Sequence, residues 1–459
     1  MRTASWAMVL LAAAFASGAE TARPIRVVVP KDAAPRVEFG VARLMNALRS
    51  VGYDPVRAAA RDGGPAIVIG NPKKDPALAR LVRTASPAFL NPEGFVMAGL
   101  GGGVTAVGAT GDTGLLYGCL ELEARVRAAR SVPPRLAVSD APSFSLRGPA
   151  IGMQRPEITH DGVQYDYLYT PENFPFFYDR AHWTRYLDFL LENRMNTLYL
   201  WTGHPFTSLL ELPRYPEARE LAPEQLRKNI ETFKWLTSEA DKRGIWVIQK
   251  FYNIHISHAL AKARNVPIVY SRPTELASAY MRYAVSEFIR SYKHVGFMLC
   301  LGEALQDDYD AEWLTGVILT GVKDGMRALG ITEEPPVIVR AHSTPIEQVM
   351  AAATRVYSNL LTMHKYNGEG LTTPEPRGEV RRLHESLAKL APAHIVNVHL
   401  LSNLEPFRWG AIGFIRKSML SCQRMGAKGL HLYPLRYWDW PVTADVASPP
   451  LLQIDRDWI

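Results

Sequence analysis

The chain has 459 residues, of which 47% are apolar and 21% are charged, and its formal net charge is +7 at neutral pH. This composition is typical of a globular protein and excludes a disordered or low-complexity chain, while the length exceeds that of one ordinary domain. The positive charge is modest and no run of basic residues concentrates it, so we expect no nucleic-acid partner.

The first residues, MRTASWAMVLLAAAFASGAE, have the pattern of an export signal. Arg2 supplies a positive charge, an apolar core too short to span a bilayer follows, and residues 17–19 are small, as cleavage requires. No later segment is long and apolar enough to cross a membrane. We therefore expect residues 1–19 to be a signal peptide and the protein to be exported, to the periplasm or the extracellular space.

Residues 20–140 are predicted to form a small N-terminal α/β domain. Strand patterns at 25–30 and 66–71 alternate with helical patterns, and residues 94–99 and 103–110 read as a hairpin across a glycine-rich turn. The segment GLGGGVTAVGATGDTG contains fragments of a dinucleotide-binding motif. Its first glycine cluster joins two strands, whereas that motif joins a strand to a helix, so we expect no nucleotide cofactor.

Residues 141–459 are predicted to form a (β/α)8 TIM barrel, because short apolar strands alternate with helices from there on. An open sheet would also alternate, but eight strands favour closure. The chain ends in IDRDWI soon after the eighth strand, and we expect part of the last barrel helix and a further domain to be missing. The predicted strands are residues 145–152, 196–203, 244–252, 296–303, 336–342, 356–366, 394–402 and 429–436.

Three carboxylates follow predicted strands at the end of the barrel where active sites of this architecture lie. Glu303 follows the apolar fourth strand, where burial favours a protonated carboxyl group, so it is the candidate proton donor. Glu369 and Glu405 follow the sixth and seventh strands and are candidates for the base. Carboxylates that face one cavity are what glycosidic bond cleavage requires, although Glu303 alone is also compatible with a helix cap, and Glu369 and Glu405 are equally compatible with ordinary loop acids.

Cations and aromatic residues lie at the same strand ends. Arginine and lysine there suit a ligand that bears a carboxylate, or they neutralise the glutamates of the site itself. The residues predicted to bind substrate are Arg340, Lys365, Arg155, His204, Tyr252, Asn253 and Trp438.

Metal and disulfide patterns are absent from the sequence. His255 and His258 form an H-x-x-H pair that lacks the H-E-x-x-H pattern of zinc proteases. Cys119, Cys300 and Cys422 are far apart and form no disulfide framework, and the first two lie in apolar runs typical of core thiols. We expect neither a metal nor a cofactor.

Several segments resemble one family of carbohydrate-active enzymes. PEGFVMAGLGGGVTAVGATGDTGLLYG, LCLGEAL, VIVRAH, LTMHKYNGEGLTTPEP and VHLLSNLEPF are similar to segments of the xylan α-glucuronidases, glycoside hydrolase family 67. The resemblance implies a small α/β domain, a (β/α)8 barrel and a helical C-terminal domain. It also implies an inverting hydrolysis that uses no metal or cofactor.

The same resemblance implies roles for individual residues. Glu303 falls where the general acid belongs, and Glu405 and Glu369 fall in the segments that carry the other catalytic acids. Arg340 and Lys365 fall where the family binds the uronate carboxylate. The family has a lysine shortly before its general acid where this chain has Leu299, so the reaction can be shared without the specificity for uronate.

The sequence therefore predicts an exported glycoside hydrolase that acts on an oligosaccharide or polysaccharide and possesses α-glucuronidase-like features. A hexosaminidase-type enzyme would need an adjacent Asp–Glu pair where this chain has Gly302 and Glu303, which argues against that activity. The pattern is also compatible with a non-catalytic carbohydrate-binding barrel, and with a uronate lyase that uses Lys365, Tyr366 or His364 as its base. The sequence gives no indication of the oligomeric state.

Overall fold

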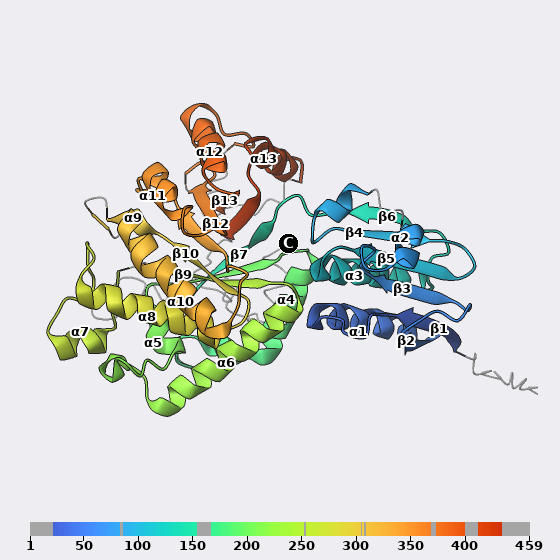
Figure 1. Ribbon diagram of the computed structural model, residues 1–459, viewed down its shortest axis with the longest axis horizontal. Helices are drawn as coiled ribbons and strands as arrows, with labels where there is room; N and C mark the ends of the chain where they lie inside the picture. The colour runs from blue at the N-terminus through green and yellow to red at the C-terminus, as the bar shows by residue number, and fades with distance from the viewer. Residues whose placement is uncertain are drawn as a thin grey trace, which may run out of the picture. The chain divides into compact units, whose positions relative to one another are not determined.

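The structure is a computed structural model that describes residues 22–82, 86–153, 167–251, 254–303, 305–306, 309–368, 373–399 and 412–433. The chain divides into two compact units, residues 1–140 and 141–459 (Figure 1). Within the described ranges, no helix combines the length and the apolar character that crossing a bilayer requires.

The first unit is built on one mixed sheet with the strand order β2-β1-β3-β5-β4-β6. The expected hairpin is confirmed, because β4 and β5 pair in antiparallel register from Phe95 opposite Ala109 to Gly99 opposite Thr105. The sequence did not predict β2 and β6, which form the two edges of the sheet and are largely exposed. The strands are β1 (Arg23–Val28), β2 (Tyr53–Ala58), β3 (Ala66–Gly70), β4 (Phe95–Gly99), β5 (Val104–Ala109) and β6 (Ala137–Asp140).

Helices cover both faces of this sheet. Val107 and Gly108 are neighbours on β5 and so point to opposite faces: Val107 lies against Gly118 of α3, and Gly108 lies against Val82 of α2. Helix α1 packs on α3, with Gly40 close to Cys119. The helical elements are α1 (Pro35–Ser50), α2 (Pro76–Val82), η1 (Pro87–Leu90) and α3 (Asp112–Ala129).

The second unit is a closed eight-stranded parallel barrel in the order β7-β8-β9-β10-β11-β12-β13-β14, which confirms the predicted (β/α)8 fold. Each of the eight predicted strands coincides with an observed one, although β10 ends at Leu299, before the glutamate that the sequence placed at its end. The strands are β7 (Leu146–Gly152), β8 (Thr197–Thr202), β9 (Trp246–Phe251), β10 (Val295–Leu299), β11 (Val337–Arg340), β12 (Leu360–Lys365), β13 (Ala393–His399) and β14 (Gly429–Tyr433).

Side-chain alternation divides the barrel core into an inner and an outer layer. Leu361 and Met363 of β12 belong to the cluster inside the barrel, whereas Leu360 belongs to the cluster between strands and helices. The helices surround the strands (Figure 1). They and the short helical turns are η2 (Pro175–Tyr178), α4 (Arg180–Glu192), α5 (Phe206–Leu209), η3 (Pro216–Ala218), α6 (Pro223–Lys242), α7 (His258–Arg264), α8 (Glu275–Ser291), η4 (Leu301–Glu303), α9 (Asp310–Glu312), η5 (Trp313–Leu319), α10 (Thr320–Leu329), α11 (Ile346–Ala353), α12 (Gly378–Leu390) and α13 (Ile412–Arg424).

Side-chain caps mark where several barrel helices begin. The Asp179 carboxylate accepts a hydrogen bond from the backbone N–H of His182 at the start of α4. Ser257 and Thr274 do the same for α7 and α8. Such caps satisfy backbone donors that the first helical turn leaves unpaired.

Candidate active site

The carboxyl ends of the parallel strands meet at one mouth of the barrel, where the last inward-facing positions carry polar and aromatic side chains. Lys250 of β9 and Arg340 of β11 stand two residues beyond Ile248 and Ile338, which belong to the apolar cluster inside the barrel. Lys365 follows Met363 in the same way on β12. The period of two along a strand thus places three basic side chains on the inner side of the barrel mouth.

Glu303 lies in the turn η4, directly after the fourth strand of the barrel. The turn is held against the loop after β11, because the Gly302 N–H donates a hydrogen bond of 3.1 Å to Thr344 Oγ1. A Cβ at Gly302 would lie 1.8 Å from the carbonyl oxygen of Ser343, so no other residue fits there without moving the backbone. Glycine before Glu303 is therefore a requirement for close approach of two loops.

Glu303 and Arg340 form an ion pair, with Oε1 and Nη1 2.9 Å apart. The Arg340 side chain is 6% exposed and that of Glu303 is 22% exposed, so the carboxylate is the member that solvent reaches. The same Nη1 atom donates to Cys300 Sγ at 3.6 Å. His342 Nε2 lies 3.6 Å from Glu303 Oε1, and its imidazole is more open to solvent. The fold thus brings Glu303 and Arg340, which were predicted at the ends of two different strands, into direct contact.

The other cations of this mouth have lowered proton affinities. Burial lowers the pKa of Lys365, the charge of Arg340 lowers it further, and Glu303 opposes both. The pKa of His342 is lowered by burial and then by Arg340 and Lys365, again against Glu303. The described part of the site holds more basic side chains than acidic ones, and their mutual repulsion contributes to these lowered pKa values.

Lys250 was expected from the sequence at the carboxyl end of the third strand of the barrel, but it was assigned no role there. Its side chain is buried, and Nζ lies 3.8 Å from the ring centre of Trp201 and 4.3 Å from that of Tyr433. The alternation of β9 could have identified it, because Lys250 occupies the same inward parity as Trp246 and Ile248. His342, Trp201 and Tyr433 were likewise expected at this end of the barrel without an assigned role.

His204, which the sequence placed among substrate-binding residues, is only 2% exposed. Its ring stacks on Tyr280 at an interplanar angle of 16°, and Nε2 lies 3.2 Å from the Tyr280 hydroxyl. The ring of Phe206 packs against it edge-on. These contacts favour a packing role for His204 rather than contact with a ligand.

The remaining predicted site residues lie outside the described part of the chain. They are the two further acids and four of the substrate-binding candidates: Glu369, Glu405, Arg155, Tyr252, Asn253 and Trp438.

His364 and Tyr366, two of the bases considered for a lyase, lie on the outer side of the barrel and not at its mouth. His364 and Tyr366 have the opposite strand parity to Lys365, and His364 faces His384 of α12 with ring centres 5.7 Å apart. Burial lowers the pKa of His364 to about 4 and raises that of Tyr366 to about 12. These two residues belong to the outer layer of the barrel, which argues against their acting as base at the mouth.

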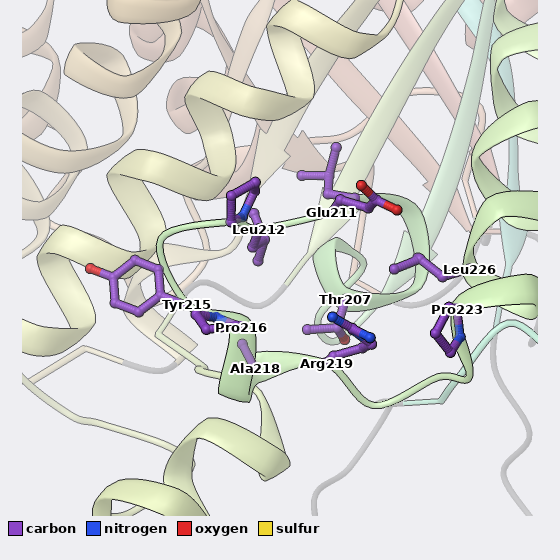
Figure 2. Close-up of a pocket in the computed structure, with 11 residues that line it drawn as sticks. Thr207, Glu211, Leu212, Tyr215, Pro216, Ala218, Arg219, Pro223 and Leu226 are labelled. Atoms are coloured by element: carbon purple, nitrogen blue, oxygen red, sulfur yellow. The ribbon is translucent and has the colours of Figure 1, made fainter.

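Metal ligands do not gather in the described ranges, where no group of three or more histidine, cysteine, aspartate or glutamate side chains is arranged to hold an ion. A cavity of about 350 Å³ is lined by the segment that leads from α5 into α6 (Figure 2). Glu211 and Arg219 border it and Leu226 contributes to its wall, but none of the residues predicted for the active site does.

The chain is similar to a solved GH138 enzyme targeting pectin rhamnogalacturonan II, with 43% sequence identity and a TM-score of 0.82. The match covers 92% of this chain and 47% of that one, so the chain spans about half the length of that enzyme. The matched half of that enzyme therefore resembles this chain in both sequence and fold. No family model matches the sequence, and no curated protein matches it.

More remote structures share the fold. A GH115 4-O-methyl-α-glucuronidase with specificity for decorated arabinogalactans is 14% identical, with a TM-score of 0.54 and coverage of 95% of this chain and 56% of that one. The GH20 β-N-acetylhexosaminidase from Streptomyces coelicolor A3(2) is also 14% identical, with a TM-score of 0.52 and coverage of 94% and 84%. Identities this low show a common architecture alone. The GH138 match agrees in kind with the resemblance to glycoside hydrolases found in the sequence, and the remote structures add the fold alone.

Proposed function

We propose that this protein is a glycoside hydrolase that cleaves a complex plant-type polysaccharide at the barrel mouth around Glu303. The observation that carries the proposal is the 43% identity over 92% of the chain to an enzyme targeting pectin rhamnogalacturonan II. The geometry adds a solvent-accessible carboxylate held by a buried arginine where barrel enzymes carry out their chemistry.

Glu303 is proposed as the group that protonates the leaving oxygen of the glycosidic bond. A second carboxylate must then activate water or attack the sugar carbon, and Glu369 and Glu405 are the proposed candidates. General acid catalysis of this kind contributes about 10²–10⁴-fold to the rate.

The excess of positive groups supports release of a uronic acid. In the described part of the mouth, the single carboxylate of Glu303 faces Arg340 and Lys365, with Lys250 close enough for their charges to affect its pKa. A sugar carboxylate would balance this charge, and the planar guanidinium of Arg340 can bind it through paired hydrogen bonds.

An acidic substrate would also prepare Glu303 for its role. The 2.9 Å ion pair with Arg340 is made by the carboxylate form of Glu303, whereas a proton donor must carry its proton. A substrate carboxylate that takes over the hydrogen bonds of Arg340 removes this obstacle. Substrate recognition and activation of the acid are then parts of one event.

The test replaces Glu303 with glutamine, which keeps the size and polarity of the side chain but cannot donate an acidic proton. Glu303→Gln should lose about 10²–10⁴-fold of the activity on an unactivated oligosaccharide, and far less on an aryl glycoside with a good leaving group. Glu312→Gln, the same change at an exposed glutamate of α9, is the matched control. Equal losses on both substrates would show that Glu303 is not the proton donor, and unchanged activity would remove it from the site.

Export is also proposed, because a large polysaccharide cannot enter a cell and the first nineteen residues have the pattern of a cleaved signal. Expression in a bacterial host followed by fractionation and N-terminal sequencing should find the chain outside the cytoplasm, beginning near Glu20. Recovery of the chain from the cytoplasm with an intact N-terminus would contradict the proposal.

A further inference from the structure

Lys250 stands out among the described side chains of the barrel, because it is a lysine with no exposed surface. Its Nζ atom makes no hydrogen bond to the described residues and lies between two aromatic rings, 3.8 Å from the centre of Trp201 and 4.3 Å from that of Tyr433. A buried ammonium group normally requires a carboxylate or several acceptors. In the described part of the mouth, the faces of the Trp201 and Tyr433 rings surround the Lys250 amine instead of such acceptors.

The charges around Lys250 come from three strands and one turn. Glu303 in η4 favours its protonation, as Cys300 after β10 would if it were a thiolate, whereas Arg340 of β11 and Lys365 of β12 oppose it. The only carboxylate among these groups is already paired with Arg340 at 2.9 Å. The neighbours on β8 and β14 are Trp201 and Tyr433, which carry no charge at neutral pH.

Two opposing effects decide the charge of the amine. Interaction with the faces of two aromatic rings is worth about 2 kcal/mol each when desolvated, and it favours the ammonium form. Removing an ammonium ion from water costs several kcal/mol even after the protein relaxes, and two nearby cations add repulsion. Burial and repulsion act in the same direction, toward the uncharged amine, and they hold the pKa of this residue well below its usual value.

We propose that Lys250 is an uncharged amine in the unliganded protein and takes up a proton when an anionic sugar binds at the barrel mouth. Binding of a uronate and uptake of a proton from solvent are then coupled. The inference rests on the proposed function for the identity of the ligand, and it assigns to that site a residue which the catalytic proposal does not use.

The coupling follows from simple electrostatics. A sugar carboxylate bound by Arg340 and Lys365 cancels the positive charge that opposes protonation of Lys250, while the two rings remain in place to stabilise the ammonium form. The new cation in turn attracts the bound anion. A neutral sugar brings no charge and gives no such effect, so Lys250 acts as a positioning residue that raises selectivity for acidic sugars.

The first measurement is made on the unliganded full chain with lysine labelled at Cε. The Cε resonance of Lys250, identified by its loss in Lys250→Met, should have the chemical shift of an amine at pH 7. It should move to the shift of an ammonium group on addition of D-glucuronate or D-galacturonate, and stay in place with D-glucose or D-galactose. An ammonium shift in the unliganded protein would overturn the proposal.

The second measurement is calorimetric titration with the same uronates in two buffers of different ionisation enthalpy. For each uronate bound, the wild-type protein should take up about one proton more than Lys250→Met, because any proton gained by Glu303 is gained in both. As the pH rises through the window where Lys250 is protonated on binding, the affinity of the wild type should fall about tenfold per pH unit relative to that of the variant. Lys234→Met, at an exposed position of α6, should behave as wild type. Equal uptake in wild type and Lys250→Met would assign all of it to Lys365, His342 or Glu303 and overturn the proposal.

The outcomes separate this inference from the proposed function. Hydrolysis that depends on Glu303, together with uronate binding free of proton uptake, would overturn the inference alone. Proton-coupled binding of uronates by a protein that hydrolyses no glycoside would support the inference and overturn the proposed activity. Failure of both uronates to bind would overturn the coupling even if Lys250 is uncharged.

Discussion

The inner and outer faces of strand β12 carry similar residues in opposite settings. On the inner face, Lys365 shares a half-open site with Glu303 and Arg340, and positive charge exceeds negative charge. On the outer face, His364 lies beside a buried chain of neutral groups under α12. One strand thus contributes both to a site with unbalanced charge and to a buried polar layer that contains a chain of hydrogen bonds.

The outer chain is connected by hydrogen bonds at every step. His394 Nδ1 lies 3.0 Å from Thr362 Oγ1, His394 Nε2 lies 2.8 Å from His384 Nδ1, and His384 Nε2 lies 3.1 Å from the Tyr366 carbonyl oxygen. Buried polar groups that are paired in this way stabilise a fold, whereas unbalanced charge is available for a ligand. The comparison shows that residue type alone does not distinguish a functional site from a polar core.

The largest effect should follow from breaking the ion pair on the inner face. Arg340→Ala leaves Glu303 without its partner and removes the proposed carboxylate-binding group, a type of loss that costs about 3–5 kcal/mol when the pair is buried. We expect catalytic efficiency on uronate glycosides to fall by about 10²–10³-fold and to fall much less on neutral glycosides. Equal losses on both would mean that Arg340 supports the structure without contacting the substrate.

The second prediction is that acid lowers the stability of the folded protein through the buried histidines of the outer face. The pKa values of His364, His384 and His394 are lowered chiefly by burial, that of His364 to about 4, so the unfolded chain binds more protons than the folded one below pH 6.5. Above that pH, the contribution of these three histidines to the free energy of unfolding is constant. As the pH falls toward 4, the free energy of unfolding should drop by about 1.4 kcal/mol per unit for each such histidine.

Urea unfolding at several pH values measures this slope. His364→Phe removes one titrating group from the buried layer and should make the slope shallower, while Lys365→Met on the inner face should leave it unchanged in this range. An acid dependence equal in wild type and His364→Phe would show that His364 does not contribute to it.

A smaller loss should follow from shortening the chain of hydrogen bonds. Thr362→Val keeps the shape of the side chain but removes the hydroxyl, whose oxygen lies 3.0 Å from His394 Nδ1 and 3.1 Å from the Leu387 carbonyl oxygen. We expect a decrease of about 1–2 kcal/mol in the free energy of unfolding at pH 7. Activity should be retained, because the change lies on the outer face; a large loss of activity would show that the two faces are coupled.

The smallest effect should come from an exposed ion pair on the surface of α12. Arg381 Nε and Glu385 Oε1 are 2.8 Å apart, but both side chains are more than one-third exposed. Arg381→Ala should therefore change the stability by about 0.5 kcal/mol or less. A loss comparable with that of Arg340→Ala would contradict the view that burial, rather than charge pairing itself, separates the two sites.

The barrel strands could be predicted from the sequence because each is an apolar run buried on both faces. The strands that were missed, β2 and β6, form the two edges of the first sheet, where each strand has a neighbour on one side only. Most of their residues are exposed, so their sequences carry little apolar pattern. The end of β10 was placed too late for a related reason. Apolar residues continue to Leu301, but the chain has already left the sheet at Cys300 to form the turn that carries Glu303.

By itself, the sequence determined the alternation of strands and helices, and with it the end of the barrel at which Glu303, Arg340 and Lys365 would gather. That prediction needs only local periodicity and the rule that parallel strands end together. The tertiary structure alone decided which of these groups touch, that His204 is packed among aromatic rings, and that Lys250 lies between Trp201 and Tyr433. These are contacts between residues far apart in the chain, and no local pattern encodes them, because they depend on how the barrel closes.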